Sequence, residues 1–140
     1  VSLGTVGSQS TQEEVLKFTV TADANEDVYI TSITVVEVGT ATSSVSHFKL
    51  YEGSTEKKDI TSDLVFDMSA TPLVVGKGTS KTYTIKADTS AVAVDATYGL
   101  SLEKGSSSNN ILWAEYFVAG NNPGNADLIY TLPIANTKKY

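Results

Sequence analysis

The strongest constraint on the fold is a two-residue alternation of apolar and polar side chains that recurs in short segments. In EVLKFTVTA, residues 14–22, the apolar Leu16, Phe18, Val20 and Ala22 fall on alternate positions. A strand with one buried face requires this period, whereas an amphipathic helix repeats every 3.6 residues. No apolar stripe with the helical period persists for three turns, so the sequence predicts a protein made of strands.

Turn signals separate further segments of this kind. The predicted strands comprise residues 28–38, 47–51, 64–67, 73–75, 82–87, 97–102, 111–118 and 128–134. Stretches rich in Gly, Asn, Asp and Ser, such as ADANED and EGSTEKKD, lie between them. Only AVAVDA, residues 91–96, suggests a helix, and it is too short to be stable alone. About 8–9 antiparallel strands predict an all-β chain with a single antiparallel β-sandwich of immunoglobulin-like or jelly-roll topology, a closed barrel being the alternative.

One predicted strand contains an irregularity. Ile30 and Ile33 are both apolar but three residues apart, so the inward-facing positions change phase between them. This predicts a β-bulge near Thr31 and Ser32 that re-aims the side chains.

Composition limits the classes of partner. The net charge is -6, and the ten cationic side chains are scattered lysines, which argues against nucleic acid or an anionic membrane as partner. No apolar run approaches the ~20 residues of a membrane span, so we expect no membrane insertion. The chain has no cysteine, which excludes disulfides and cysteine-ligated zinc. Its 16 serines and 18 threonines suit half-exposed strands.

Gly76, Lys77, Gly78 and Thr79 hint at a phosphate-binding loop. Such a loop requires Ser or Thr directly after its lysine and a helix after that, but here Gly78 follows Lys77 and the next residues alternate as a strand. We therefore predict a hairpin turn whose glycines accept positive φ.

Catalytic groups form no recognisable set in the sequence. His47 alternates with Phe48 and Leu50, so it is expected to face outward. No second histidine and no cysteine can complete a nucleophile relay with it. The sequence thus predicts a protein that is not an enzyme and binds no cofactor.

Asp23, Asn25 and Asp27 are the candidate metal ligands, because alternate oxygen ligands resemble the start of a calcium loop. The sixth and twelfth positions of such a loop would be Val28 and Thr34, where glycine and glutamate are required. A solvated turn is the favoured interpretation, and a calcium-binding surface turn stays open.

Aromatic residues gather at Trp113 and Tyr116, a candidate contact for a sugar ring or a protein partner. Tyr29, Tyr51 and Tyr140 are further candidates for exposure. Core packing explains Trp113 equally well, since sandwiches commonly bury a tryptophan.

Two parts of the chain differ in character. Residues 1–12 form a leading apolar strand and flexible linker, and residues 13–140 form the β-sandwich domain. Val1, Leu3 and Val6 supply the apolar positions of the leader. It is either the first strand of the same sandwich or a donor strand that pairs with a neighbouring copy.

The strand and turn segments VLKFTVTA, DVYITSITV, FKLYEGS, VVGKGTSKTYTIKADTS and LPIANT resemble the immunoglobulin-like β-sandwich module of prokaryotic surface-layer and adhesin-like cell-surface proteins. The resemblance covers residues 15–137 and includes no catalytic signature. It implies an extracellular or cell-surface location and a role as a structural building block.

Two functions follow as expectations. The first is a secreted, non-enzymatic structural subunit of an extracellular, pilus-like filament or a surface layer, whose partners are copies of itself in a homopolymer. The alternative is a monomeric cell-surface recognition module, an adhesin or carbohydrate-binding domain whose partner is a glycan. The two functions differ in stoichiometry, since the first requires a homopolymer and the second a monomer.

Overall fold

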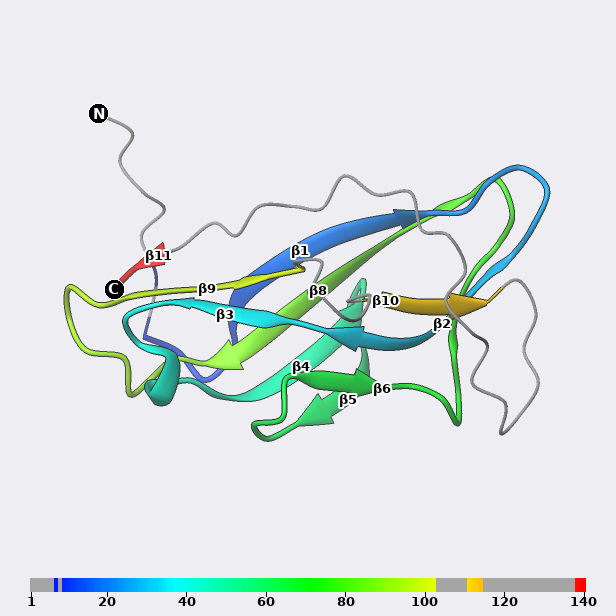
Figure 1. The fold of residues 1–140 in the computed structure, drawn as a ribbon. Coiled ribbons are helices and arrows are strands. Elements are labelled where there is room, and N and C mark those ends of the chain that lie inside the picture. Colours follow the sequence, from blue (N-terminus) through cyan, green and yellow to red (C-terminus); the bar gives the residue numbers. More distant parts are fainter. Residues whose placement is uncertain (1–6, 8, 103–110, 115–137) are drawn as a thin grey trace, which may run out of the picture.

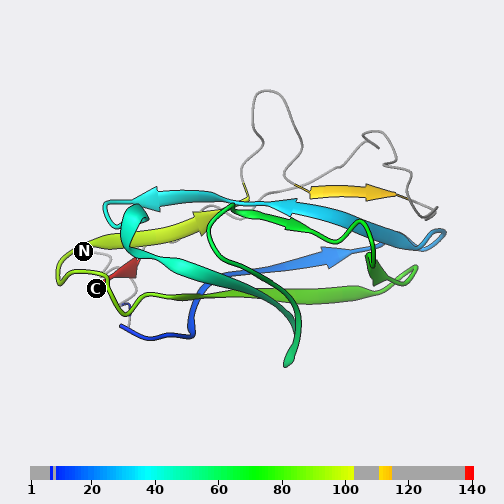
Figure 2. The same ribbon diagram turned by 90° about the horizontal axis from the view of Figure 1, so that it is seen from below.

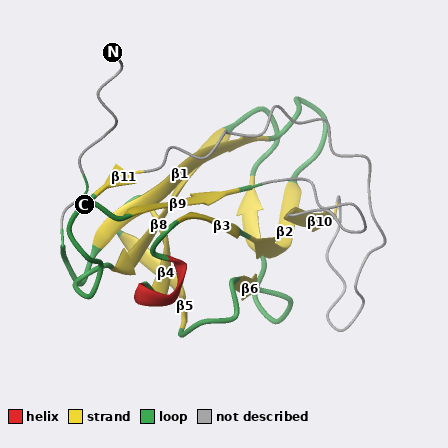
Figure 3. Cartoon of the chain, turned by 60° about the vertical axis from the view of Figure 1, so that its left-hand side comes forward, coloured by secondary structure: helices red, strands yellow, loops and turns green. Residues whose placement is uncertain are grey.

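Strands make up nearly all the regular structure. The computed structural model describes residues 7, 9–102, 111–114 and 138–140, the four residues 111–114 by their backbone alone. The strands are β1 (Glu13–Thr21), β2 (Val28–Thr34), β3 (Val36–Gly39), β4 (Ser46–Glu52), β5 (Thr55–Ile60), β6 (Val65–Asp67), β7 (Leu73–Val75), β8 (Ser80–Asp88), β9 (Thr97–Ser101), β10 (Ile111–Ala114) and β11 (Lys138–Lys139). The helical content of the described residues is one 3-10 turn, η1 (Thr42–Ser44), and residues 91–96, the one segment that suggested a helix, form turns (Figure 3).

The strands pair into three antiparallel sheets, which confirms the all-β antiparallel prediction. One sheet has the order β1-β8-β4-β5, the second has the order β10-β2-β6 with β7 also on β2, and the third has the order β11-β9-β3 (Figure 1). Seen from below, β1 and β8 run along one side of the molecule while β2 and β3 run along the other (Figure 2). β1 and β8, which are distant in sequence, thereby lie side by side.

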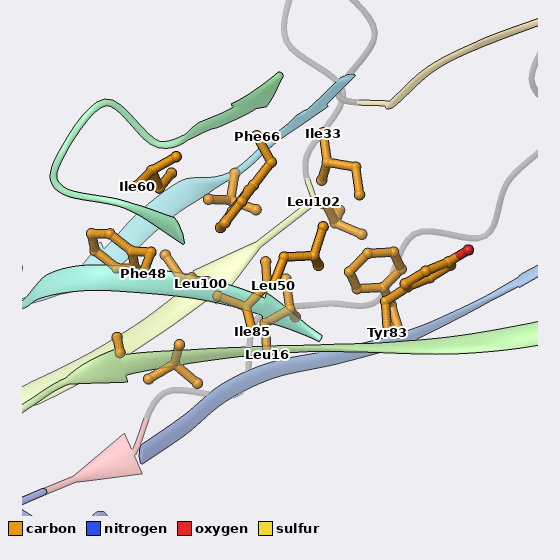
Figure 4. Packing of buried hydrophobic residues seen from close by; sticks show 14 of the residues in the cluster. Leu16, Ile33, Phe48, Leu50, Ile60, Phe66, Tyr83, Ile85, Leu100 and Leu102 are labelled. Carbon is orange, nitrogen blue, oxygen red and sulfur yellow. The ribbon is translucent and has the colours of Figure 1, made fainter. Parts of the chain in front are cut away.

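A single apolar core receives side chains from all three sheets. Tyr83 and Ile85 of β8, Ile33 of β2 and Leu100 of β9 are completely buried (Figure 4). They occupy the inward positions that the alternation predicts. Each such side chain stabilises the fold by roughly 1.5–3 kcal/mol relative to an exposed one.

The predicted bulge in β2 is confirmed. Ile33 pairs with Ile111 and Ile30 pairs with Trp113, while Thr31 between them has no opposite residue on β10. The extra residue lets both isoleucines reach full burial although they are three positions apart.

The segment predicted as one strand at residues 28–38 is divided between two sheets. β2 ends at Thr34, and β3 begins at Val36 and pairs with β9. Val35 lies between them, is buried, and donates its N–H to the carbonyl of Leu64 at 3.0 Å. The alternation continues across the junction, which is why periodicity alone shows a single strand.

β5 corrects another prediction, because TEKKDI was read as part of a charged turn. It pairs with β4 along its whole length, after a turn in which Gly53 has φ 60°. The charges belong to an exposed strand at the edge of its sheet, where Lys49 of β4 forms ion pairs with Glu56 (3.0 Å) and Asp59 (3.6 Å). Charged residues on an edge strand discourage pairing with other chains.

The described strands number eleven, above the eight or nine expected.

Candidate functional site

The Gly76–Thr79 turn packs against the turn at residues 22–27, at one end of β1 and β8 (Figure 1). The backbone N–H of Lys77 donates to Asp27 Oδ1 at 2.8 Å. The N–H of Gly78 donates to the carbonyl of Asp23 at 2.5 Å, and that of Thr79 donates to the carbonyl of Gly76 at 3.0 Å. We call these two turns the turn joint.

The hydrogen bonds of the turn joint argue against a phosphate-binding site. The three successive N–H groups that would cradle a phosphate already have acceptors within the protein, and one acceptor is a carboxylate that would repel an anion. A β-strand, β8, follows the turn, so no helix N-terminus faces the loop. The geometry suits a structural turn.

The prediction of a hairpin at this turn is wrong, because the two strands that the turn joins do not pair with each other. β7 pairs with β2, whereas β8 pairs with β1 and β4, so the turn connects two different sheets. Gly78 has φ 68°, as a tight turn requires, and Gly76 lies outside the left-handed region.

The candidate metal ligands form part of the same joint. Asp23 Oδ1 accepts the N–H of Asn25 at 2.7 Å, and Asp27 Oδ1 accepts the N–H of Lys77. Both carboxylates thus support backbone turns. Among the described residues no group of three His, Cys, Asp or Glu side chains could hold a metal ion. The solvated turn stays the favoured interpretation, and calcium binding by this turn stays the untested alternative.

His47 is exposed, as the alternation predicts, but its backbone is unusual. It has φ 52° and lies at an irregularity in the pairing of β4 with β8. Its N–H donates to the carbonyl of Thr61 at 3.1 Å. The left-handed conformation had no sequence signal, since glycine is the usual residue there.

The leader and the main aromatic cluster lie outside what the structure describes. Val1, Leu3, Val6 and Tyr116 are not among the described residues, and for Trp113 the backbone alone is described, in β10. Their predicted roles in assembly and aromatic contact stay predictions.

The tyrosines expected on the surface are half-buried. Tyr51 has the Lys86 ammonium 5.0 Å from its ring centroid, and its hydroxyl donates to Gln12 Oε1 at 3.2 Å. Tyr140 packs against the core, and burial raises the pKa of its hydroxyl.

Tyr140 belongs to a cluster at the other end of β1 and β8 that sequence reasoning missed. Its N–H donates to the carbonyl of Ala96 at 2.9 Å, and its carbonyl accepts the N–H of Asp95 at 2.5 Å. Lys139 pairs with the Asp95 carboxylate at 2.7 Å and thereby lowers its pKa. Lys138 and Glu13 form an ion pair of 2.6 Å. We call β11 together with Tyr140 the C-terminal latch.

The C-terminal latch holds the start of the described chain. The N–H of Gly7 donates to the carbonyl of Lys139 at 2.8 Å, while β11 pairs with β9 on its other side. A Cβ added at Gly7 would lie 2.6 Å from ring carbons of Tyr140, so a larger side chain would require the Tyr140 ring to move. A two-residue strand is too short to show an apolar period, which is why sequence patterns did not predict β11.

Next to the latch, the predicted linker runs along the turn after β8. Gln9 Nε2 donates to the carbonyl of Val92 at 2.5 Å. Ser10 donates its N–H to Thr89 Oγ1 at 3.2 Å and accepts the N–H of Thr89 at 2.7 Å. Residues 7 and 9–10, here named the docked strip, are therefore bound to the body of the domain.

No known protein family matches the sequence, and no similar protein was found among curated proteins or solved structures. Within the described residues, no helix is long and apolar enough to cross a membrane.

Proposed function

We propose that this chain is a secreted, non-enzymatic structural subunit that assembles with copies of itself into an extracellular filament or surface layer. In this proposal the domain is a β-sandwich of immunoglobulin-like or jelly-roll topology. The three antiparallel sheets around one apolar core support that architecture.

The observation that carries the proposal is the position of the leader's base. Gly7 is bound at the outer side of β11, so the apolar Val1, Leu3 and Val6 precede a fixed point beside a sheet edge. An apolar strand attached to a folded domain at a fixed point can add to a neighbouring copy through backbone hydrogen bonds. Such head-to-tail contacts between copies continue as filaments or lattices.

The behaviour of the described carboxyl groups supports a structural role over a catalytic one. Every carboxyl pKa that departs from its ordinary value is lowered: that of Glu52 by Lys81, those of Asp67 and Asp88 by neighbouring serines, and that of Asp95 by Lys139. Catalytic acids usually require a raised pKa. These carboxylates act in turns and ion pairs.

On the exposed side of the β1-β8-β4-β5 sheet, hydroxyl pairs join neighbouring strands. Thr19 and Thr82 join their hydroxyls at 2.9 Å across β1 and β8, and Thr21 and Ser80 do so at 2.8 Å. Hydroxyl pairs of this kind stabilise neighbouring strands without charge. For the recognition alternative, Tyr51 is a poor sugar platform because Lys86 occupies one face of its ring.

The test is the state of association of the purified chain. Light scattering after size exclusion, with negative-stain microscopy, is expected to show regular polymers, and Leu3→Asp is expected to abolish them by placing a charge in an apolar contact. Ser2→Asp is the matched control, since it adds the same charge at the alternate position. A chain that remains a 14.8 kDa monomer at high concentration would refute the filament and favour the recognition module. Regular polymers formed by Leu3→Asp would refute the role of the leader.

A further inference from the structure

We infer that the docked strip and the C-terminal latch form a single clasp, which opens as a unit while the sheets stay folded and which acid releases by breaking the Lys138–Glu13 and Lys139–Asp95 ion pairs. The clasp is a device of one folded domain, so it goes beyond the proposed function and does not depend on assembly. Its two parts meet at the turn between β8 and β9, residues 89–96 (Figure 2).

This turn is the common anchor of the strip and the latch. Near its start, the N–H of Thr89 donates to the carbonyl of Ser10 in the strip at 2.7 Å. Near its end, the N–H of Asp95 donates to the carbonyl of Tyr140 in the latch at 2.5 Å. A movement of the turn that frees one part therefore strains the contacts of the other.

The strip and the latch also bind each other directly. The N–H of Gly7 donates to the carbonyl of Lys139 at 2.8 Å. The ring of Tyr140 lies against Gly7, since a Cβ added there would be 2.6 Å from the ring carbons. The strip, the latch and the turn are thus bound to one another in pairs, so the release of one segment removes contacts from both of the others.

Hydrogen bonds and ion pairs, rather than apolar burial, hold most of the clasp. Every described residue of the strip and the latch is exposed or half-buried, whereas Tyr83 and Ile85 of β8 are completely buried. Tyr140 alone among the clasp residues packs against the core. Segments with few buried apolar contacts open at a lower free energy than the whole domain unfolds. The clasp is therefore expected to open while the sheets remain paired.

Two carboxylates make the clasp sensitive to acid. Lys138 pairs with Glu13 of β1 at 2.6 Å, where both side chains are largely buried, and Lys139 pairs with Asp95 at 2.7 Å, where both are exposed. Lys139 lowers the pKa of Asp95 below its ordinary 3.8. A carboxyl whose pKa is lowered in this way stabilises the closed clasp above its open-state pKa, and this contribution disappears as the pH falls through the lowered value. Opening should therefore become easier below about pH 4.

Other titratable side chains surround the clasp. They are Glu14 on β1, Asp88 on β8, His47 on β4, Glu37 on β3 and Tyr98 on β9. Hydrogen bonds from Ser90, with a smaller effect of the His47 charge, lower the pKa of Asp88, and Glu37 accepts the hydroxyl of Tyr98. The side-chain hydrogen bonds described for these groups lie outside the strip and the latch. A change at Glu13 therefore isolates the contribution of the clasp's own ion pairs.

Amide hydrogen exchange, measured residue by residue on the whole chain, tests the single opening. The reporters are the N–H groups that join the parts of the clasp, those of Gly7, Thr89, Asp95 and Tyr140. At neutral pH we expect their protection factors to agree within about threefold and to lie below those of β8. A larger spread would show separate openings, and protection as high as in β8 would show that the clasp opens only with the whole domain. Either result would overturn the inference.

Gln9→Ala tests the coupling from the side of the strip. It removes the side-chain hydrogen bond to the turn, and we expect the N–H groups of Asp95 and Tyr140 to lose as much protection as that of Thr89, about two- to tenfold. Gln12→Ala is the matched control, because the Gln12 side chain binds β4 instead. A loss confined to Thr89, or no loss at all, would overturn the single opening.

Glu13→Gln tests the ion pair on the side of the latch. We expect all four reporters to lose protection by about tenfold or more at neutral pH, because a hydrogen bond between charged groups is lost. Glu14→Gln is the matched control, since it removes the same charge from an exposed neighbour that makes no ion pair with any described residue. Equal effects of the two variants would show that net charge matters rather than the clasp, and would overturn the inference.

The acid response is read from the same reporters between pH 6 and pH 3, with protection factors corrected for the intrinsic exchange rate at each pH. In the wild type, protection of the clasp should fall more steeply than that of β8, and in Glu13→Gln the fall should be smaller. If Glu13→Gln does not fold, Lys139→Met breaks the exposed pair and should cost about two- to fivefold in protection at neutral pH. Lys57→Met, which breaks an ion pair outside the clasp, is its control. Clasp protection that follows β8 down to pH 3 would overturn the acid release.

Discussion

The hydroxyl of Tyr98 donates a hydrogen bond of 2.7 Å to the carboxylate of Glu37, from β9 to the neighbouring β3. Tyr83 of β8 is equally buried, yet its hydroxyl has no hydrogen-bond partner among the residues that the structure describes. Burial raises the pKa of both hydroxyls, that of Tyr83 to about 12. The two buried tyrosines thus differ mainly in whether a described residue accepts a hydrogen bond from the hydroxyl.

Removing the two oxygens should therefore change stability in opposite directions. Tyr98→Phe is expected to lower the free energy of unfolding by about 1.5 kcal/mol, since a hydrogen bond to a charged group is lost. Tyr83→Phe is expected to raise it by about 1 kcal/mol, because it removes a buried hydroxyl that no described residue satisfies. Urea unfolding measures both, and each variant is the control for the other. Equal losses in the two variants would contradict the assignment of partners.

The glycines of the turn joint form a second matched pair. Gly78→Ala is expected to lower the free energy of unfolding by about 1–2 kcal/mol, because Gly78 has φ 68°. Gly76→Ala is expected to be neutral or slightly stabilising, since its added Cβ would meet Thr79 Oγ1 at an ordinary 3.6 Å. Thermal unfolding distinguishes them. A larger loss for Gly76→Ala would show that the strained position has been misassigned.

The fold was predictable where one strand has one buried face. Alternation located β1, β8 and the bulge at Thr31, because packing of one face against a core imposes a period of two. β5 was missed since its exposed charges have no apolar period, and an edge strand is defined by its partner rather than by its own residues. The division between β2 and β3 was missed because both sheets continue the same alternation.

The candidate site was less predictable because it depends on contacts between distant residues. The sequence analysis singled out Asp23, Asp27 and Gly78 separately. It did not predict that these residues meet in the turn joint. Nothing local marks Tyr140 as the partner of Gly7, since they are at opposite ends of the chain. Local patterns predict turns and strands, while the pairing of turns depends on which strands, distant in sequence, lie next to each other.

Metal removal should leave the fold unchanged. Asp23 and Asp27 are already used as acceptors for backbone N–H groups, so we expect EDTA to shift the melting temperature by less than about 2 °C. Asp23→Asn is the control, because an asparagine oxygen can still accept the N–H of Asn25 while binding calcium less well. A fall of more than about 10 °C with chelator, restored by calcium, would reveal a structural ion at this turn.

Acid should destabilise the domain through Glu52. Its carboxylate is held by Lys81 at 2.6 Å and by Lys57 at 3.1 Å, across β8, β4 and β5. These contacts, the hydrogen bond from Lys81 first, lower the pKa of Glu52 below its ordinary 4.5. A carboxyl whose pKa is lowered by folding stabilises the folded state above its unfolded pKa, and this contribution disappears as the pH falls through the folded value.

Glu52→Gln should therefore be less stable than the wild type at pH 7, and the difference should shrink as the pH falls below about 4.5 and through the lowered pKa of Glu52. Urea midpoints measured at pH 7, 5, 4, 3 and 2 follow this change. Glu14→Gln is the matched control, because Glu14 is an exposed β1 carboxyl that makes no ion pair with any described residue. It should differ little from the wild type throughout. A Glu52→Gln deficit that persists unchanged at pH 2 would mean that the variant loses packing rather than the ion pairs of Glu52.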